Sequence, residues 1–393
     1  MQILVLNCGS SSIKYKLFLM PKAEVISKGM IDRIGFKDSV FDYTYKNIPQ
    51  KNKIYFKNHE QGIKYILKIL DQEKISAVGH RVVHGGEIFK SSVKINEKVI
   101  KEIKKCIDLA PLHNPPNLKG ILTIKKLLPK IPQVAIFDTA FHQTIPDYAY
   151  MYALPYSLYK KHKIRKYGFH GTSHQYVSKR GCQILKLNFE KQKIITCHLG
   201  NGASMAAIDQ GKVIDTSMGM TPLEGLIMGT RPGDTDPGAL IYLMQKEKLN
   251  AEKLNELLNK KSGILGVTEI SSDLRDVKNA AWNKNNKKAK LALEMYYYRI
   301  KKYIGAYTAA MNGLDILIFT GGVGENAPRI RQEILKNLDY LGIQTDTKLN
   351  EKIIGKESTI NKKGSKVKIL VIPTNEELVI AEETEKILFY IKI

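Results

Sequence analysis

One glycine-containing turn in this chain has the residue types needed to bind an anion. His198-Leu199-Gly200-Asn201-Gly202 follows a short apolar run, Ile194–Cys197, and precedes a second strand-like run, Ala203–Ile208. Glycines let backbone N–H groups approach a ligand closely, and a row of such donors suits an anion. The turn is not a P-loop, because no GxxxxGK[ST] motif occurs and a strand pattern follows the glycines. Taken alone, such a turn is more often an ordinary hairpin.

The same pattern occurs at the N-terminus. Apolar Ile3–Leu6 runs into Asn7-Cys8-Gly9-Ser10-Ser11-Ser12, and Ile13–Phe18 then alternates apolar and polar residues. Two similar β-meanders, each at the start of one half of the chain, predict a duplicated unit. Two anion-binding hairpins facing each other across a cleft would hold a polyphosphate from both sides.

Charged side chains adjoin other glycine-rich or apolar segments. Arg81 lies between glycines at the end of a predicted strand, which favours a cleft residue over a surface salt bridge. Arg231 lies in a second such segment, Gly229–Asp234. Asp138 follows the apolar strand Gln133–Phe137, and its alternative role is a helix N-cap. His170 precedes Gly171 at a predicted helix start, which fits phosphate contact, although a lone histidine is more often structural.

The elements that must position these residues alternate between strands and helices. Residues 35–60 are polar and lysine-rich and are expected at the surface, with weak strand signals. Ser271 is expected to cap a helix that begins near Asp273. Further strands are expected at 25–28, 75–78, 212–217, 316–320 and 368–372, and helices at 61–70, 99–109, 118–128, 175–186, 240–248, 251–261, 287–313 and 378–390. We expect a first α/β domain over residues 1–146, onto which 377–393 packs back, and a second over 147–376.

Composition excludes several classes of protein. The formal net charge is +24, but 53 of the 62 basic residues are lysines spread along the chain, which disfavours a nucleic-acid-binding patch. The four cysteines form no CxxC pair, so neither a zinc site nor a disulfide framework is expected. No stretch is apolar enough to span a membrane, and the N-terminus lacks a signal segment. We therefore expect a cytoplasmic protein with no membrane partner.

The motifs together resemble the acetate kinase family of the actin-like ATPase and sugar kinase superfamily, from Met1 to the last helix. They occur in this order: LNCGSSSIKYKLF, GHRVVHGG, APLHNPPN, FDTAFH, YGFHGTSH, CHLGNGAS, DTSMGMTPLEGL, GTRPGDTDP, FTGGVGENA and PTNEE. The resemblance implies a duplicated actin-like α/β fold with two domains around a nucleotide cleft. It also implies a homodimer whose second domain binds nucleotide and forms the dimer.

The resemblance assigns roles to individual residues. Catalysis falls to Arg81, Asp138, His170, Arg231 and Glu376, with His113, His170 and Arg231 supporting the transition state. The acetate methyl group would lie among Val83, Leu112, Phe169 and Pro222, beside Arg81. Metal binding falls to Asn7 and Glu376. Nucleotide and phosphate binding fall to Asn7, Ser12, Lys14, His198, Gly200, Asn201, Gly202, Asp273, Leu274, Arg275, Gly322, Val323, Gly324 and Asn326.

Two positions depart from the family pattern. Leu274 stands where phenylalanine is common, on the adenine side of the expected site. Pro232 follows Arg231 where a small residue is common, and proline removes one N–H and stiffens the loop. The arginine itself is retained.

The activity implied is reversible phosphoryl transfer between ATP and acetate, giving ADP and acetyl phosphate by direct in-line attack. Phosphoryl transfer requires mainly positioning and charge stabilisation, which two arginines and a carboxylate-held Mg²⁺, or Mn²⁺ in its place, would supply. One alternative is a propionate or butyrate kinase on the same scaffold, because one methylene changes binding by only about 1–3 kcal/mol. An alternative of another class is an actin-like or chaperone-like nucleotide-switched binding protein.

Overall fold

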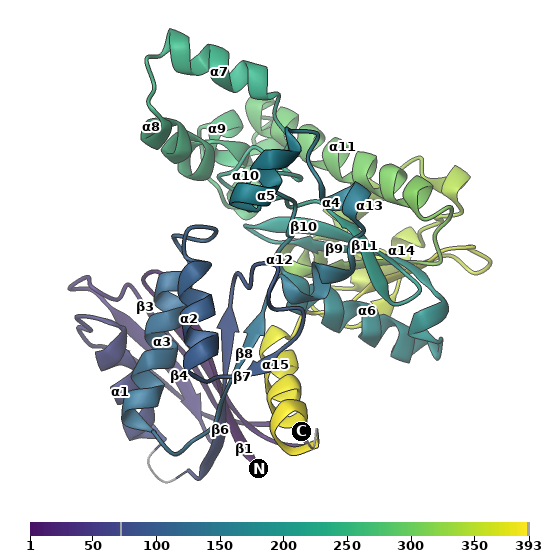
Figure 1. The fold of residues 1–393 in the computed structure, drawn as a ribbon. Helices are drawn as coiled ribbons and strands as arrows, with labels where there is room; N and C mark the ends of the chain where they lie inside the picture. The colour runs from purple at the N-terminus through teal and green to yellow at the C-terminus, as the bar shows by residue number, and fades with distance from the viewer. Residues whose placement is uncertain (71–72, 391–393) are drawn as a thin grey trace. The chain divides into compact units, whose positions relative to one another are not determined.

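The computed structural model describes residues 1–70 and 73–390, and it divides into two compact units (Figure 1). The first comprises Met1–Gln143 together with Asn375–Ile393, and the second comprises Thr144–Thr374. The sequence predicts these boundaries near residues 146 and 376. The C-terminal helix therefore belongs to the first unit.

The first unit is a mixed sheet covered by helices on both faces. Its strand order is β5-β4-β3-β2-β1-β6-β8-β7. Alternate residues of β1 face opposite cores: Leu4 and Leu6 pack with α1 and α3, whereas Ile3 and Val5 pack with α15. The strands are β1 (Gln2–Cys8), β2 (Ile13–Leu19), β3 (Glu24–Asp32), β4 (Val40–Tyr45), β5 (Ile48–Lys53), β6 (Ile75–Val82), β7 (Val93–Lys94) and β8 (Gln133–Phe137); the helices are α1 (His59–Ile69), α2 (Glu97–Lys105), α3 (Asn114–Leu127) and α15 (Glu376–Glu385).

The second unit has a sheet of strand order β11-β10-β9-β12-β14-β13, with α6 on one face and α11 on the other (Figure 1). Its strands are β9 (Lys193–Leu199), β10 (Ala203–Asp209), β11 (Lys212–Thr216), β12 (Ile316–Thr320), β13 (Ser358–Thr359) and β14 (Lys368–Val371). Its helices are α4 (Asp147–Tyr150), α5 (Tyr156–His162), α6 (Gly171–Leu185), α7 (Pro237–Lys246), α8 (Ala251–Glu256), α9 (Gly263–Thr268), α10 (Leu274–Trp282), α11 (Lys287–Ala310), α12 (Gly321–Asn326), α13 (Pro328–Leu335) and α14 (Thr347–Lys352).

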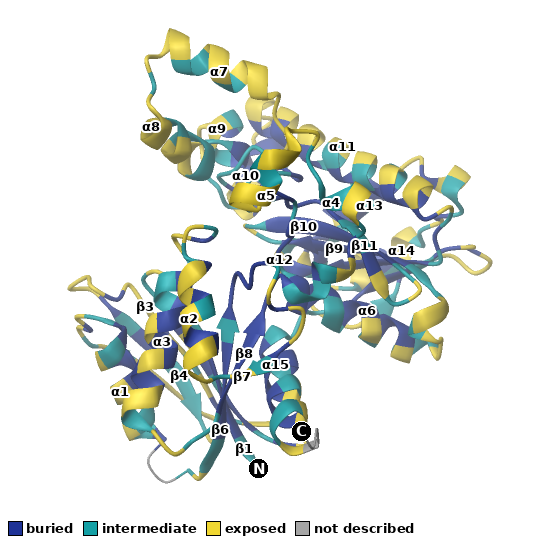
Figure 2. Ribbon diagram, viewed as in Figure 1, coloured by how far each residue is buried: buried dark blue, intermediate teal, exposed yellow. Residues whose placement is uncertain are grey.

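The two sheets repeat one topology, as the paired meanders predict. In the first, β1 is antiparallel to β2 and parallel to β6, which is parallel to β8. In the second, β9 is antiparallel to β10 and parallel to β12, which is parallel to β14. Strands β8 and β12 are buried along their whole length, whereas α7 has no buried residue (Figure 2). The expected duplicated α/β fold is confirmed.

Several local expectations differ from the structure. Residues 40–53 form β4 and β5, in line with the weak strand signals, and β5 is exposed as expected. Phe41 is the exception, because strand pairing places its ring, which is fully buried, in the first core. Helix α3 begins at Asn114, four residues before the expected Leu118, because proline is compatible with a first helical turn. Asp273 rather than Ser271 caps α10, since its carboxylate accepts from Arg275 N.

Other elements were shorter than expected or were not expected. Helix α2 ends at Lys105 instead of Leu109, and the glycines after β12 form the short helix α12 instead of a turn. Helix α9 was not expected at all. All four cysteines are buried and free, and none of the helices described is long and apolar enough to cross a bilayer.

Candidate active site

In the first unit, Arg81 and Asp138 form an ion pair at the ends of two parallel strands. In the register of β6 and β8, Arg81 lies opposite Ile136 and Val82 opposite Phe137, so both strands end at the same edge. Arg81 Nε donates to Asp138 Oδ1 and Oδ2 at 3.1 Å each, and Nη2 donates to Oδ2 at 2.5 Å. Asp138 is fully buried, whereas 21% of the Arg81 side chain is exposed. The carboxylate therefore orients a guanidinium that is still partly accessible.

The environment keeps this guanidinium charged. Burial alone lowers the pKa of Arg81, but the carboxylates of Asp138 and Glu376 outweigh burial and raise it. Burial raises the pKa of Asp138, and the charge of Arg81 acts in the opposite direction. His113, which precedes α3, also acts on the Asp138 carboxyl, so the unit places it near the pair. A permanently charged, oriented arginine suits a phosphoryl group.

Oxygen atoms that suit a hard cation surround the same guanidinium. Arg81 Nη1 donates to Asn7 Oδ1 at 3.4 Å, and Arg81 Nε lies 4.0 Å from Glu376 Oε2. Glu376 is the first residue of α15. No cluster of three or more His, Cys, Asp or Glu side chains that could hold a metal occurs in residues 1–70 and 73–390. One amide and one carboxylate fit Mg²⁺, which usually keeps several waters and also binds substrate phosphates.

The turn between β1 and β2 is held by contacts that its sequence does not reveal. Gly9 N donates to Ser12 O at 2.8 Å, and His59 Nε2 bonds Gly9 O at 2.7 Å. Lys14, expected to bind phosphate, forms an ion pair with Glu377. Glu377 adjoins Glu376 in the sequence but was not predicted as a partner of Lys14.

Two buried asparagines on the first turn of α3 fasten the chain that follows Arg81. Asn117 Oδ1 accepts from Val83 N at 3.0 Å, and its Nδ2 donates to Cys8 O at 2.7 Å. Asn114 bonds both backbone groups of His84, with Oδ1 accepting from N and Nδ2 donating to O at 3.0 Å each. Asn117 thereby joins the end of β1, next to Asn7, to the end of β6. Both residues belong to the APLHNPPN motif, but this segment was expected to be a loop, so a role on a helix was not predicted for them.

In the second unit, the β9–β10 turn lies beside two histidines. Gly200 N donates to Gly202 O at 3.1 Å, and Gly229 N donates to Asn201 O at 3.0 Å. His170 precedes α6 in a left-handed conformation, with φ of 57°, and its ring stacks on His198 with centroids 4.4 Å apart. A Cβ built on Gly202 would lie 3.5 Å from His170 Nε2, so this nitrogen faces the turn. The unit therefore brings together His170, His198 and the glycine turn.

Arg231 differs from Arg81 in its surroundings. It is half-buried, and no carboxylate pairs with its guanidinium within the described residues. Burial lowers its pKa, although an arginine remains charged at neutral pH. The loop is compact, because Met228 N donates to Arg231 O at 3.0 Å and Asp234 N donates to Gly225 O at 3.0 Å. A half-buried cation without a counter-charge is suited to bind an anionic ligand.

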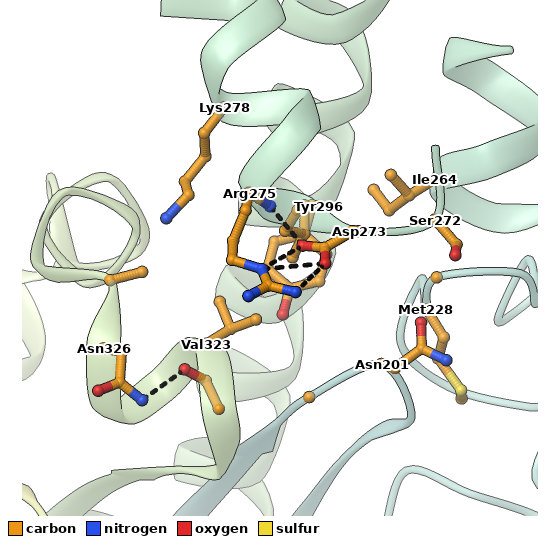
Figure 3. A pocket seen from close by; sticks show the side chains of 15 residues that line it. Asn201, Met228, Ile264, Ser272, Asp273, Arg275, Lys278, Tyr296, Val323 and Asn326 are labelled. Carbon is orange, nitrogen blue, oxygen red and sulfur yellow. Dashed lines mark hydrogen bonds and ion pairs between the residues drawn. The ribbon is translucent and has the colours of Figure 1, made fainter. Parts of the chain in front are cut away.

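A cavity of about 630 Å³ in the second unit lies among α10, α12 and the β9–β10 turn (Figure 3). The cavity is lined by eight of the residues that were expected to bind nucleotide: Gly200, Asn201, Asp273, Leu274, Arg275, Gly322, Val323 and Asn326. Residues not foreseen from sequence also line it: Met228, Gly229, Ile264, Ser272, Lys278, Tyr296 and Ala327. Its size fits a nucleoside.

The rim of this cavity carries both charges and apolar groups. Arg275 Nη2 bonds Asp273 Oδ2 at 2.6 Å, and 85% of the Arg275 side chain is exposed (Figure 3). Leu274 is buried, and Lys278 is one turn further along α10, a helical spacing that could have identified it. Gly202 and Gly324 do not line the cavity; a Cβ built on Gly324 would lie 3.4 Å from the backbone of Phe319 and 3.6 Å from Cys197 O.

The four residues expected around the acetate methyl group are divided between the units. In the first, Val83 is buried and Leu112 is 56% exposed. In the second, Phe169 is buried and Pro222 is half-buried.

Comparison with known proteins reveals extensive similarity. Residues 2–382 match the model of the acetokinase family. The acetate kinase of Thermoanaerobacter pseudethanolicus is 54% identical, over 98% of this chain and 99% of that protein. The crystal structure of Porphyromonas gingivalis acetate kinase superposes with a TM-score of 0.94 at 52% identity, covering 98% of this chain and 99% of the other. A propionate kinase from Francisella tularensis superposes with a TM-score of 0.93 at 43% identity, covering 98% of this chain and 100% of the other.

Proposed function

Because the chain belongs to the acetokinase family, we propose that it catalyses reversible transfer of the γ-phosphoryl group of ATP to acetate, giving acetyl phosphate and ADP. The observation that carries this proposal is identity above 50% to acetate kinases over nearly the whole chain. The unpaired Arg231 and the nucleoside-sized cavity support it from the structure.

Each proposed role follows from the chemistry of the side chain. A carboxylate oxygen of acetate attacks the γ-phosphorus in line, the bond to the β–γ bridging oxygen breaks, and ADP leaves with the electron pair. Arg81 and Arg231 neutralise the equatorial oxygens of the transferring group, and Asp138 holds Arg81 in its orientation. His113 and His170 support the same charge. Asp273, Leu274, Arg275 and Gly322 bind the nucleoside, and Val83 contacts the methyl group of acetate.

We propose Mg²⁺ as the metal, held by Asn7 and Glu376 together with nucleotide phosphates and water. When bound, the ion would offset phosphate charge. The test is Glu376→Ala, which should require more Mg²⁺ for half-maximal activity and be nearly inactive. Asp346→Ala is a matched control, because Asp346 caps α14 in the other unit. Equal Mg²⁺ dependence in Glu376→Ala and wild type would remove Glu376 from the metal site, and replacing Mg²⁺ by Mn²⁺ tests the choice of ion.

The direct test of the function is a hydroxylamine trap for acyl phosphate with ATP and a series of carboxylates. Acetate should give the highest kcat/KM. A propionate kinase is the second candidate, favoured by the similarity to the Francisella tularensis enzyme, and a higher kcat/KM with propionate would select it. ATP turnover without any short carboxylate would instead indicate a nucleotide-switched binding protein.

We further propose that the protein acts in the cytoplasm, where ATP is available, and as a homodimer formed through the second unit. The exposed side chains of Ile241 and Tyr242 on α7 support an interface there. Sedimentation velocity should give a dimer for wild type and a larger monomer fraction for Ile241→Asp. A monomeric wild-type protein would refute the dimer.

A further inference from the structure

Two histidines of the second unit share one serine hydroxyl. Ser204 Oγ lies 2.8 Å from His170 Nδ1 and 2.8 Å from His174 Nε2. Ser204 is on β10, and both histidines come from the N-terminal end of α6, His170 as its N-cap. Ser204 and His174 are fully buried. A hydroxyl carries one proton, so Ser204 donates to one imidazole nitrogen and accepts from the other.

A third hydrogen bond determines which groups donate and which accept in this series. His174 Nδ1 lies 2.7 Å from Thr196 Oγ1, and Thr196 is fully buried on β9. Within the described part of the chain, no other hydrogen bond involves the Thr196 hydroxyl. A buried hydroxyl proton without an acceptor is costly, so Thr196 donates to His174 Nδ1. His174 then carries its proton on Nε2 and donates to Ser204, and Ser204 donates to His170 Nδ1.

His170 is thereby left with its proton on Nε2. This nitrogen faces the β9–β10 turn, 3.5 Å from the position of a Cβ on Gly202. An imidazole that accepts at Nδ1 carries no proton there, so this hydrogen bond requires a neutral His170, whose ring stacks on that of His198. His198 is itself held by Ser173, whose Oγ lies 2.8 Å from His198 Nδ1 and 2.9 Å from Thr374 Oγ1.

We propose that Ser204 and His174 are positioning residues that hold neutral His170 in the tautomer with its proton on Nε2, so that it donates a hydrogen bond to the transferring phosphoryl group. This inference rests on the proposed function only for the identity of the acceptor. The tautomer itself is a property of the resting protein and can be measured without turnover. His170 would be catalytic by contact, and the other two act through it.

The first experiment measures the tautomer. In protein labelled with ¹⁵N-histidine, long-range ¹H–¹⁵N spectra distinguish protonated from unprotonated ring nitrogens, and His170→Asn assigns the His170 signals. At pH 7.5, wild type should show a protonated Nε2 and an unprotonated Nδ1 at His170. Ser204→Ala should give a mixture of tautomers. A protonated Nδ1 in wild type would overturn the proposal.

The second experiment measures turnover. Ser204→Ala should lower kcat at least about 10-fold, because the donor loses its orientation, while KM for acetate changes by less than about threefold. Ser204→Thr retains a hydroxyl and should recover most of kcat. Ser178→Ala is the matched control, because Ser178 is another buried serine on α6, whose hydroxyl donates to Gln175 O at 3.1 Å within the same helix. It should leave kcat unchanged.

The outcomes separate the two proposals. If Ser204→Ala does not fold, His174→Phe replaces it, because phenylalanine keeps a planar ring but cannot donate a hydrogen bond to Ser204. Equal kcat in wild type and the folded Ser204 or His174 variant would overturn the positioning role. A wild type that makes no acyl phosphate would overturn the proposed function, while the NMR measurement would still decide the tautomer.

Discussion

Replacing Asp138 by asparagine should affect stability and turnover together, because it leaves a neighbouring charge without its main partner. In wild type, Asp138 is fully buried and accepts three hydrogen bonds from Arg81 at 2.5–3.1 Å. The Asp138→Asn side chain has nearly the same shape but no charge, and its NH₂ group would face the guanidinium. The remaining carboxylate, Glu376, lies 4.0 Å away.

The magnitude follows from the burial of the pair. Removing one partner of a buried ion pair costs about 3–5 kcal/mol. Since 21% of the Arg81 side chain reaches solvent and Glu376 is near, we expect the lower end, about 3 kcal/mol in the free energy of unfolding. The matched control is Asp38→Asn, which breaks an ion pair with Arg33 whose two side chains are 66% and 53% exposed. That change should cost less than about 0.5 kcal/mol.

The assay must resolve the two units, because their unfolding need not be one transition. Hydrogen exchange of β6 and β8 reports the stability of the first unit, and the hydroxylamine trap reports kcat. Nucleotide binding can be followed separately through Trp282, the single tryptophan, because Lys278 lines the cavity and lies over its ring. Asp138→Asn should bind nucleotide normally and lose at least about 100-fold in kcat.

The result that would refute this reasoning is specific. If hydrogen exchange of β6 and β8 changes equally in Asp138→Asn and Asp38→Asn, the buried pair does not stabilise the first unit. If kcat of the folded Asp138→Asn protein stays within about threefold of wild type, Arg81 does not need Asp138 for its orientation.

Three further predictions concern the first unit. Burial lowers the pKa of His80 from 6.5 to about 4, so the unfolded chain takes up a proton between these values that the folded chain does not. From pH 6.5 down to about 4, His80 should therefore lower the free energy of unfolding by up to about 1.4 kcal/mol per pH unit, and urea titrations of His80→Asn should show a pH dependence weaker by this amount. Asn117→Ala, which frees Val83 N and Cys8 O, should lower kcat more than nucleotide affinity; equal kcat in Asn117→Ala and wild type would contradict the joining role. Val83→Ala should narrow a preference for acetate over propionate of about 10-fold, whereas a core role alone would lower stability and leave the kcat/KM ratio unchanged.

The residues proposed to carry the chemistry were predicted from the sequence because their signals are local. An apolar run, a glycine turn and an alternating run lie within some 20 residues, and strand pairing follows from that pattern. The duplication, the strand ends that carry Arg81 and Asp138, and the pairing of β9 with β10 were foreseen for this reason. Residues that line the cavity, such as Asp273 and Val323, were foreseen through family motifs and not through physics.

What only the tertiary structure decided depends on contacts between residues distant in sequence. No local pattern shows that Asn117 bonds Cys8, that Glu377 pairs with Lys14, or that β4 brings Phe41 into the core. The chain from Thr196 through His174 and Ser204 to His170 joins two strands and a helix. In the unfolded chain, each of these polar side chains can bond to water or to many other groups. In the folded protein it is buried, and a buried polar group without a hydrogen bond is costly, so the packing of distant segments decides which partner it has.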